Sequence, residues 1–187
     1  DFCLSRGLGD VYKRQIYQST IYRYCIFAPK WRLEMEVEVM RAPYNVLVIL
    51  YISKSENPLF CIFKRADMGV WQFIAGGGET GEDALSAARR EAFEEAAISS
   101  DHTYNKLESM CYVSVDNFSE KARKSWGKRY VIPVFTFSVK LDSCEIRLSD
   151  EHTTYSWCTY QEAKEKLHFD LDKTALYELN QLLLNAQ

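Results

Sequence analysis

A chain of 187 residues is long enough to form one globular domain with a buried core. The formal net charge of −3 argues against a broad surface for a nucleic acid duplex or an anionic membrane, and the longest apolar run, residues 46–52, is too short to span a bilayer. The six cysteines form no C-x-x-C pair and have no histidines at metal-binding spacing, which predicts free thiols and a reducing, cytoplasmic location.

The first residues differ from the rest of the chain. The chain does not begin with Met, and the stretch SRGLGDVYKRQ, residues 5–15, has no apolar periodicity and is similar to the translated read-through of a sequencing-adapter junction. A truncated, poorly ordered natural terminus is the alternative. We expect residues 1–15 to be non-native or disordered and residues 16–40 to be a partly ordered extension, with a native start at Met35 or Met40. The folded domain is expected over residues 41–187.

Runs of apolar, β-branched and aromatic residues predict strands along the chain. The turn residues 53–58 join the first two strands in a hairpin, and the third strand ends at the triple glycine Gly76–Gly78. The predicted strands are Asn45–Ile52, Leu59–Lys64, Trp71–Ala75, Lys106–Val115, Arg129–Lys140 and Thr153–Cys158.

Helical periodicity predicts one helix over Asp83–Ala97 and two closing helices over Tyr160–Lys166 and Leu171–Leu184. Thr80 followed by Asp83 is typical of a capping-box start for the first of them. Residues 116–128 are polar and basic and predict a loop or a short helix. The order of elements favours a mixed α/β domain.

The first helix carries an unusual concentration of acids. Glu91, Glu94 and Glu95 are spaced so that their carboxylates converge on one patch, although each pair of like charges costs a helix about 0.2–0.5 kcal/mol. An acidic helix alone is more often a solvated face. A glycine turn just before it changes this interpretation, because glycines let the backbone turn sharply and approach a ligand closely. The pattern favours an oxygen-seeking divalent cation such as Mg²⁺, with Arg90 fixing a neighbouring carboxylate.

These residues resemble the Nudix box, G-x5-E-x7-R-E-U-x-E-E-x-G-U, in which U is a bulky aliphatic residue. Two positions depart from the pattern: Ala92 fills a position that is usually larger, and Ala97 replaces the final glycine. That glycine ends the helix in a left-handed conformation, which costs an alanine about 1–2 kcal/mol. The matching residues are Gly76, Glu82, Arg90, Glu91, Glu94, Glu95 and Ile98.

The resemblance extends from about Arg41 to Leu184 and implies an α/β/α sandwich with a mixed central sheet and a loop–helix–loop catalytic motif that binds Mg²⁺ or Mn²⁺. The WQ pair before the glycines and the motif E-H-x-x-Y-x-W, Glu151–Trp157, are similar to the branch that hydrolyses dATP-like and dihydroneopterin triphosphates. Dimers are common in the family, so a homodimer is an option.

The resemblance also implies a role for each matching residue. Arg90 would orient a glutamate, and Glu94 or Glu151 would take a proton from the attacking water. Glu91 and Glu95 would be the main metal ligands, with Glu82 acting through water or a further metal. The metal site would comprise the carbonyl of Gly76 together with Glu82, Glu91, Glu94, Glu95 and Glu151, and the catalytic set Arg90, Glu91, Glu94, Glu95 and Glu151.

Residues near the box are candidates for substrate binding. Trp71 and Gln72 are expected to stack on and hydrogen-bond a base, although a strand tryptophan is more often a core residue. Lys64 and Arg65 are expected either to contact phosphate or to form a solvated strand end. Gly77 completes this set.

The remaining candidates have a simpler interpretation. The basic segment is predicted to be a solvated loop, with substrate steering or a lid as the alternative. His152 is interpreted as a structural or surface histidine, and a histidine-based zinc site has little support. The residues of the basic segment are Lys121, Arg123, Lys124, Lys128 and Arg129.

The predicted function is a metal-dependent pyrophosphohydrolase. It would cleave a nucleoside or pterin triphosphate to the monophosphate and pyrophosphate by in-line attack of a metal-activated water. One alternative is another nucleoside diphosphate derivative, such as ADP-ribose, a nucleotide sugar or an oxidised nucleotide. The other is a non-catalytic nucleotide-binding module.

Overall fold

The computed structural model describes residues 40–53 and 57–186. The predictions for residues 1–15 and for residues 16–39 of the extension lie outside the described residues. None of the helices within the described ranges has both the length and the apolar character needed to cross a membrane.

Seven strands form one mixed sheet, which confirms the α/β prediction. The central strand β1 runs parallel to β6 and antiparallel to β2 and β4, while β5 lies antiparallel on the outer side of β6 and β3 and β7 pair with β2. The strands are β1 (Arg41–Ile52), β2 (Leu59–Arg65), β3 (Trp71–Gln72), β4 (Ile74–Glu79), β5 (Tyr104–Ser114), β6 (Val131–Lys140) and β7 (His152–Cys158).

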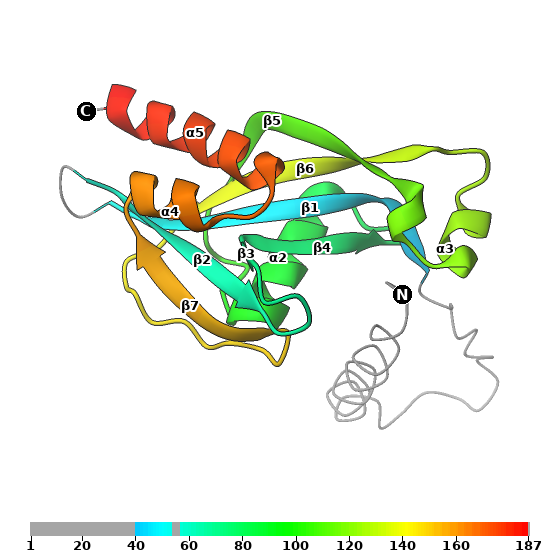
Figure 1. The fold of residues 1–187 in the computed structure, drawn as a ribbon, viewed down its shortest axis with the longest axis horizontal. Helices are drawn as coiled ribbons and strands as arrows, with labels where there is room; N and C mark the ends of the chain where they lie inside the picture. Colours follow the sequence, from blue (N-terminus) through cyan, green and yellow to red (C-terminus); the bar gives the residue numbers. More distant parts are fainter. Residues whose placement is uncertain (1–39, 54–56, 187) are drawn as a thin grey trace, which may run out of the picture.

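Helices cover both faces of this sheet, so the expected sandwich is confirmed (Figure 1). Helix α2 (Ala84–Ala96) packs its alanines on one face, and α4 (Tyr160–Lys166) and α5 (Asp170–Asn185) pack on the other. Strand β1 is apolar on both faces because each face meets a helix layer: Val46, Val48 and Leu50 point towards α2, whereas Leu47, Ile49 and Tyr51 point towards α4 and α5. The basic segment contains the short helix α3 (Glu120–Ser125), which follows the 3₁₀ turn η1 (Val115–Asn117).

The triple glycine is part of a strand, so the prediction of a sharp turn at Gly76–Gly78 is wrong. Gly76 pairs with Val46 and Gly77 with Asn45 on β1, and the chain turns only at Thr80 and Gly81. The glycines are there because neighbouring side chains occupy the space of a β-carbon. At Gly78 a β-carbon would come within 2.0 Å of the Tyr44 ring.

Helix α2 begins and ends in ways that differ from the expected motif. Its N-cap is Asp83, whose carboxylate accepts the Ser86 N–H at 2.7 Å. The predicted capping role of Thr80 is wrong, since its hydroxyl donates to the Met40 carbonyl. At the other end, Ala97 adopts the left-handed conformation (φ 54°, ψ 33°) and donates its N–H to Phe93. An alanine therefore makes the helix exit that the motif assigns to glycine.

Candidate active site

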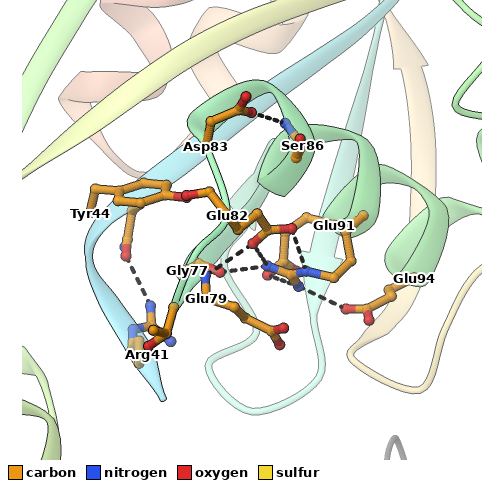
Figure 2. Close-up of polar contacts among 12 residues, drawn as sticks. Arg41, Tyr44, Gly77, Glu79, Glu82, Asp83, Ser86, Glu91 and Glu94 are labelled. Carbon is orange, nitrogen blue, oxygen red and sulfur yellow. Dashed lines mark hydrogen bonds and ion pairs between the residues drawn. The ribbon is translucent and has the colours of Figure 1, made fainter. Parts of the chain in front are cut away.

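The side chains of Glu82, Glu91 and Glu94 lie close together beside Gly77 (Figure 2). The guanidinium of Arg90 contacts all four of these residues. Its Nη2 donates to the Gly77 carbonyl at 2.7 Å and to Glu82 Oε2 at 2.9 Å, while its Nε donates to Glu82 Oε1 at 3.1 Å. The bidentate pair ties the loop before α2 to the helix itself, and the bond to the Gly77 carbonyl ties the helix to strand β4.

Two helix carboxylates complete this cluster. Arg90 Nη1 lies 2.8 Å from Glu91 Oε1 and 3.3 Å from Glu94 Oε2. Burial alone would lower the pKa of Arg90, but its hydrogen bonds and charge pairs with Glu82 and Glu91 raise it above the usual range. Three carboxylates thus share one guanidinium, and the cluster keeps an excess of negative charge.

Glu95 is directed to a different partner. Its side chain is 2% exposed, and its Oε2 lies 3.6 Å from Nε2 of the buried His152. Burial lowers the pKa of His152. His152 was interpreted as a structural or surface histidine; it is buried, and its contact with an acid of the box could not be inferred from the sequence.

Strand β1 supplies two residues that the sequence analysis missed. The Tyr44 hydroxyl donates to the Glu82 carbonyl at 2.6 Å, and its pKa is raised to about 12 by burial and then by the charges of Glu82 and Asp83. The Arg41 guanidinium covers Gly77, where a β-carbon would come within 2.4 Å of it. The triple glycine is the sequence signal that could have pointed to Tyr44 and Arg41. A strand that lacks side chains leaves space beside it, and large side chains from the neighbouring strand fill that space.

The cluster fits a divalent cation by its chemistry. Glu91 and Glu95 are buried, and the Glu91 carboxylate occupies the space that a side chain at Gly76 would fill. In the described part of the chain, no group of three or more His, Cys, Asp or Glu side chains is arranged so that it could hold a metal ion by itself. Mg²⁺ does not require one, because it keeps waters and substrate phosphate oxygens among its ligands. Glu91 and Glu95 are the residues best placed to hold it.

The structure brings Glu151 and Arg65 to the same region. Glu151 is exposed in the turn before β7, and its carbonyl accepts the Ala66 N–H at 2.9 Å. The same turn contacts the end of α2, since the Ser149 N–H donates to the Glu95 carbonyl at 3.1 Å. Arg65 lies opposite His152 in the strand register and forms a bidentate pair with Asp67.

The structure does not bring Trp71 and Lys64 to this cluster. The Trp71 ring packs into the core on the α4 and α5 face and lies under the Lys166 ammonium, 5.8 Å from it. Lys64 pairs with Trp71 across the strands and shares that face. Gln72 is buried on the α2 face, opposite Phe63, so only the second residue of the WQ pair lies on the same face as the acids.

The basic segment is exposed and partly paired with its own acids. Lys124 contacts Glu120 at 2.7 Å and Arg123 contacts Asp116 at 3.4 Å. These contacts agree with the predicted solvated surface. Substrate steering by Lys121, Lys128 and the other cations stays a prediction.

Comparisons with known proteins agree with this architecture. The family model for the NUDIX domain matches residues 42–179. A crystal structure from Listeria monocytogenes described as a Nudix hydrolase is 38% identical, with a TM-score of 0.70, and the match covers 78% of this chain and 97% of that one. The E. coli dihydroneopterin triphosphate pyrophosphohydrolase is 21% identical over 78% of this chain and 99% of its own, with a TM-score of 0.62, which is a likeness of fold.

A curated relative extends the comparison. The RNA pyrophosphohydrolase of Bradyrhizobium sp. (strain ORS 278) is 33% identical over 95 residues, which are 47% of this chain and 55% of that protein. The chain thus spans about half the length of this curated relative. The family model, however, covers well over half of the chain and includes the acidic helix, β4, α4 and the first part of α5. The chain belongs to the Nudix family.

Proposed function

We propose that this chain is a metal-dependent pyrophosphohydrolase that cleaves a nucleoside or pterin triphosphate to the monophosphate and pyrophosphate. One observation carries the proposal. Glu91 and Glu95, one helical turn apart, are both buried beside a glycine strand, with exposed fractions of 6% and 2%. Burying two carboxylates is costly unless positive groups compensate them. Arg90 compensates part of this charge through its ion pair with Glu91, and a divalent cation would compensate more of it.

In this proposal the glutamates of the cluster hold the metal. Glu91 and Glu95 hold Mg²⁺ or Mn²⁺ with the Gly76 carbonyl, and Glu82 and Glu94 add negative charge around them. The bound metal would neutralise phosphate charge and lower the pKa of a water molecule.

The other residues orient the carboxylates, accept a proton or bind the substrate. Arg90 fixes the rotamers of the carboxylates that it contacts. Glu94 or Glu151 accepts the proton of the water that attacks phosphorus in line. Arg65, Gln72 and Gly77 contact the substrate. Trp71 and Lys64, which lie on the α4 and α5 face, are left out of this binding set.

A second candidate substrate is an RNA that carries a 5′ pyrophosphate group. The observation that favours it is the 33% identity with a relative named RNA pyrophosphohydrolase. ADP-ribose, a nucleotide sugar or an oxidised nucleotide, and a purely nucleotide-binding module, remain the further alternatives. The four described cysteines are free, which supports the cytoplasmic location, and a homodimer stays part of the proposal.

A substrate panel with and without Mg²⁺ tests the proposal. It contains dNTPs, dihydroneopterin triphosphate, ADP-ribose, dinucleoside polyphosphates and 5′-triphosphorylated RNA, with products resolved by chromatography. We expect pyrophosphate release from a triphosphate, and loss of activity by about 100-fold or more in Glu95→Gln because a metal ligand is lost. The matched control is Glu108→Gln, an exposed glutamate on β5. Metal-independent turnover, or full activity in Glu95→Gln, would refute the mechanism.

A further inference from the structure

The contact between His152 and Glu95 joins two groups that are almost completely removed from water. The side chains are 1% and 2% exposed, and Nε2 of the imidazole lies 3.6 Å from Oε2 of the carboxylate. His152 is the first residue of β7, and its ring packs on the Phe63 ring with centroids 5.2 Å apart. The aromatic contact fixes the plane of the imidazole from the side of the core.

The main chain of the same turn reinforces this contact. The Ser149 N–H donates to the Glu95 carbonyl at 3.1 Å, and the His152 N–H donates to the Ser149 carbonyl at 3.3 Å. The turn therefore contacts both the backbone and the side chain of Glu95. This is a second, independent constraint on the position of that glutamate.

The chemistry of an imidazole suits this position, because an N–H on Nε2 would face the carboxylate oxygen. The 3.6 Å separation is longer than a hydrogen bond, and such contacts shorten when a site is loaded.

We propose that His152 is a positioning residue that holds the Glu95 carboxylate towards the metal site by donating from Nε2 to Oε2. The proposal rests on the proposed function, because it takes Glu95 to be a metal ligand. It assigns His152 a part in metal affinity that a core residue packed on Phe63 would not have. Partners of this kind typically change metal affinity or activity by about 10–100-fold.

Four variants separate positioning from packing. His152→Leu removes the donor and keeps an apolar side chain. His152→Gln carries an amide N–H that reaches the position of Nε2, whereas the shorter His152→Asn reaches only the position of Nδ1. Phe63→Leu alters the packing on the ring and leaves the donor in place.

The measurements are Mn²⁺ affinity by electron paramagnetic resonance, kcat and KM on the best substrate, and unfolding by urea. We expect His152→Leu to weaken Mn²⁺ binding about 10–100-fold and to lower kcat more than it raises KM. His152→Gln should recover most of the Mn²⁺ affinity and most of kcat. Phe63→Leu should lower stability and retain Mn²⁺ affinity. If His152→Leu does not fold, His152→Gln and His152→Asn are compared instead, and His152→Asn should bind Mn²⁺ more weakly than His152→Gln.

In the variants, two outcomes would overturn the inference: unchanged Mn²⁺ affinity in His152→Leu, or equal losses in His152→Gln and His152→Asn. Because Mn²⁺ binding is measured without substrate, it separates this inference from the proposed function. A wild-type protein that binds Mn²⁺ but hydrolyses no substrate refutes the function alone. A wild-type protein that binds no Mn²⁺ refutes both.

Discussion

The Glu91 carboxylate lies directly against the backbone of Gly76. A β-carbon on Gly76 would come within 1.9 Å of the Glu91 carboxyl carbon and 2.2 Å of its Oε1. Because β4 and α2 approach each other this closely, the carboxylate is buried between them at 6% exposure. The glycine is thus required by the position of an acid that is nearby in space and fifteen residues away in sequence.

Gly76→Ala should therefore act on the metal site rather than on the fold. The atoms that a β-carbon would meet belong to the end of a flexible side chain, so Glu91 can rotate away and the strand can persist. We expect Mn²⁺ affinity and kcat to fall about 10-fold or more, as for a displaced metal ligand. Calorimetric titration with Mn²⁺ measures the first effect and turnover the second.

The matched control for this variant is Gly81→Ala in the turn after β4. No atom lies within 4 Å of a β-carbon there, but φ is +84°, so alanine is strained by about 1–2 kcal/mol. The control should lower stability and leave Mn²⁺ affinity unchanged. Normal Mn²⁺ affinity in Gly76→Ala would contradict the prediction, because it would show that the β-carbon does not displace the Glu91 carboxylate from the metal site.

Arg90→Ala should destabilise the protein strongly. It removes the shared partner of Glu82, Glu91 and Glu94 and leaves the Gly77 carbonyl without its donor. Removing one member of a largely buried charge network costs about 3–5 kcal/mol. Urea denaturation measures this loss.

The control for Arg90 is a surface ion pair. Arg123 contacts Asp116 at 3.4 Å, and both side chains are substantially exposed. Arg123→Ala should change stability by less than about 1 kcal/mol. If Arg90→Ala cost no more than Arg123→Ala, the guanidinium would not be the element that organises the acids.

The elements of the fold could be predicted because their hydrophobic periods are clear. Helix α4 has the predicted bounds Tyr160–Lys166, and the hairpin of β1 and β2 follows from the turn between two apolar runs. The place of Trp71 could not be read in this way. Its face depends on how β3 pairs with β2, and a two-residue strand has no alternation from which to infer it.

The candidate site was predictable in composition but not in arrangement. The spacing of the box predicts that its acids share one patch; Glu91 and Glu94 both contact Arg90, whereas Glu95 contacts His152. Spacing does not determine which acid meets Arg90 and which meets His152, because that depends on a turn more than fifty residues later in the chain. The glycines predict a turn, but they lie in a strand. Composition alone does not show whether a glycine is there for backbone flexibility or because neighbouring side chains leave no space for a β-carbon.

Ala97→Gly should stabilise the protein. Ala97 occupies the left-handed conformation at φ 54°, which glycine adopts without steric strain. Part of the gain is offset by the greater freedom of glycine in the unfolded chain, so we expect a net increase of about 1 kcal/mol. Thermal unfolding measures it, and hydrolysis should stay unchanged because the metal site is preserved.

The control for this variant is glycine at the neighbouring position 96. Ala96→Gly lies within the helix and is buried, so glycine should cost about 1 kcal/mol there. Equal effects of the two substitutions would mean that the helix exit stores no strain at Ala97.

Asp172→Asn should remove a pH dependence of stability. Asp172 is 1% exposed in the first turn of α5; it accepts the Phe73 N–H, and among the described residues its Oδ2 has no hydrogen-bond partner. Burial raises its pKa to about 8, so the folded protein keeps a proton that the unfolded chain loses near pH 4. Stability from this group is therefore fully present below about pH 4 and is lost as the pH rises towards 8.

Asparagine imitates the protonated carboxyl and has no charge to bury. With each unit of pKa shift equivalent to about 1.4 kcal/mol, the wild-type protein should lose about 3 kcal/mol more than Asp172→Asn between pH 5 and pH 8. Urea denaturation at both pH values measures the difference, with the fully exposed Asp170→Asn as the control. Parallel pH profiles for wild type and Asp172→Asn would show that Asp172 is ionised in the folded state, and that a partner outside the described residues or a local opening compensates its charge.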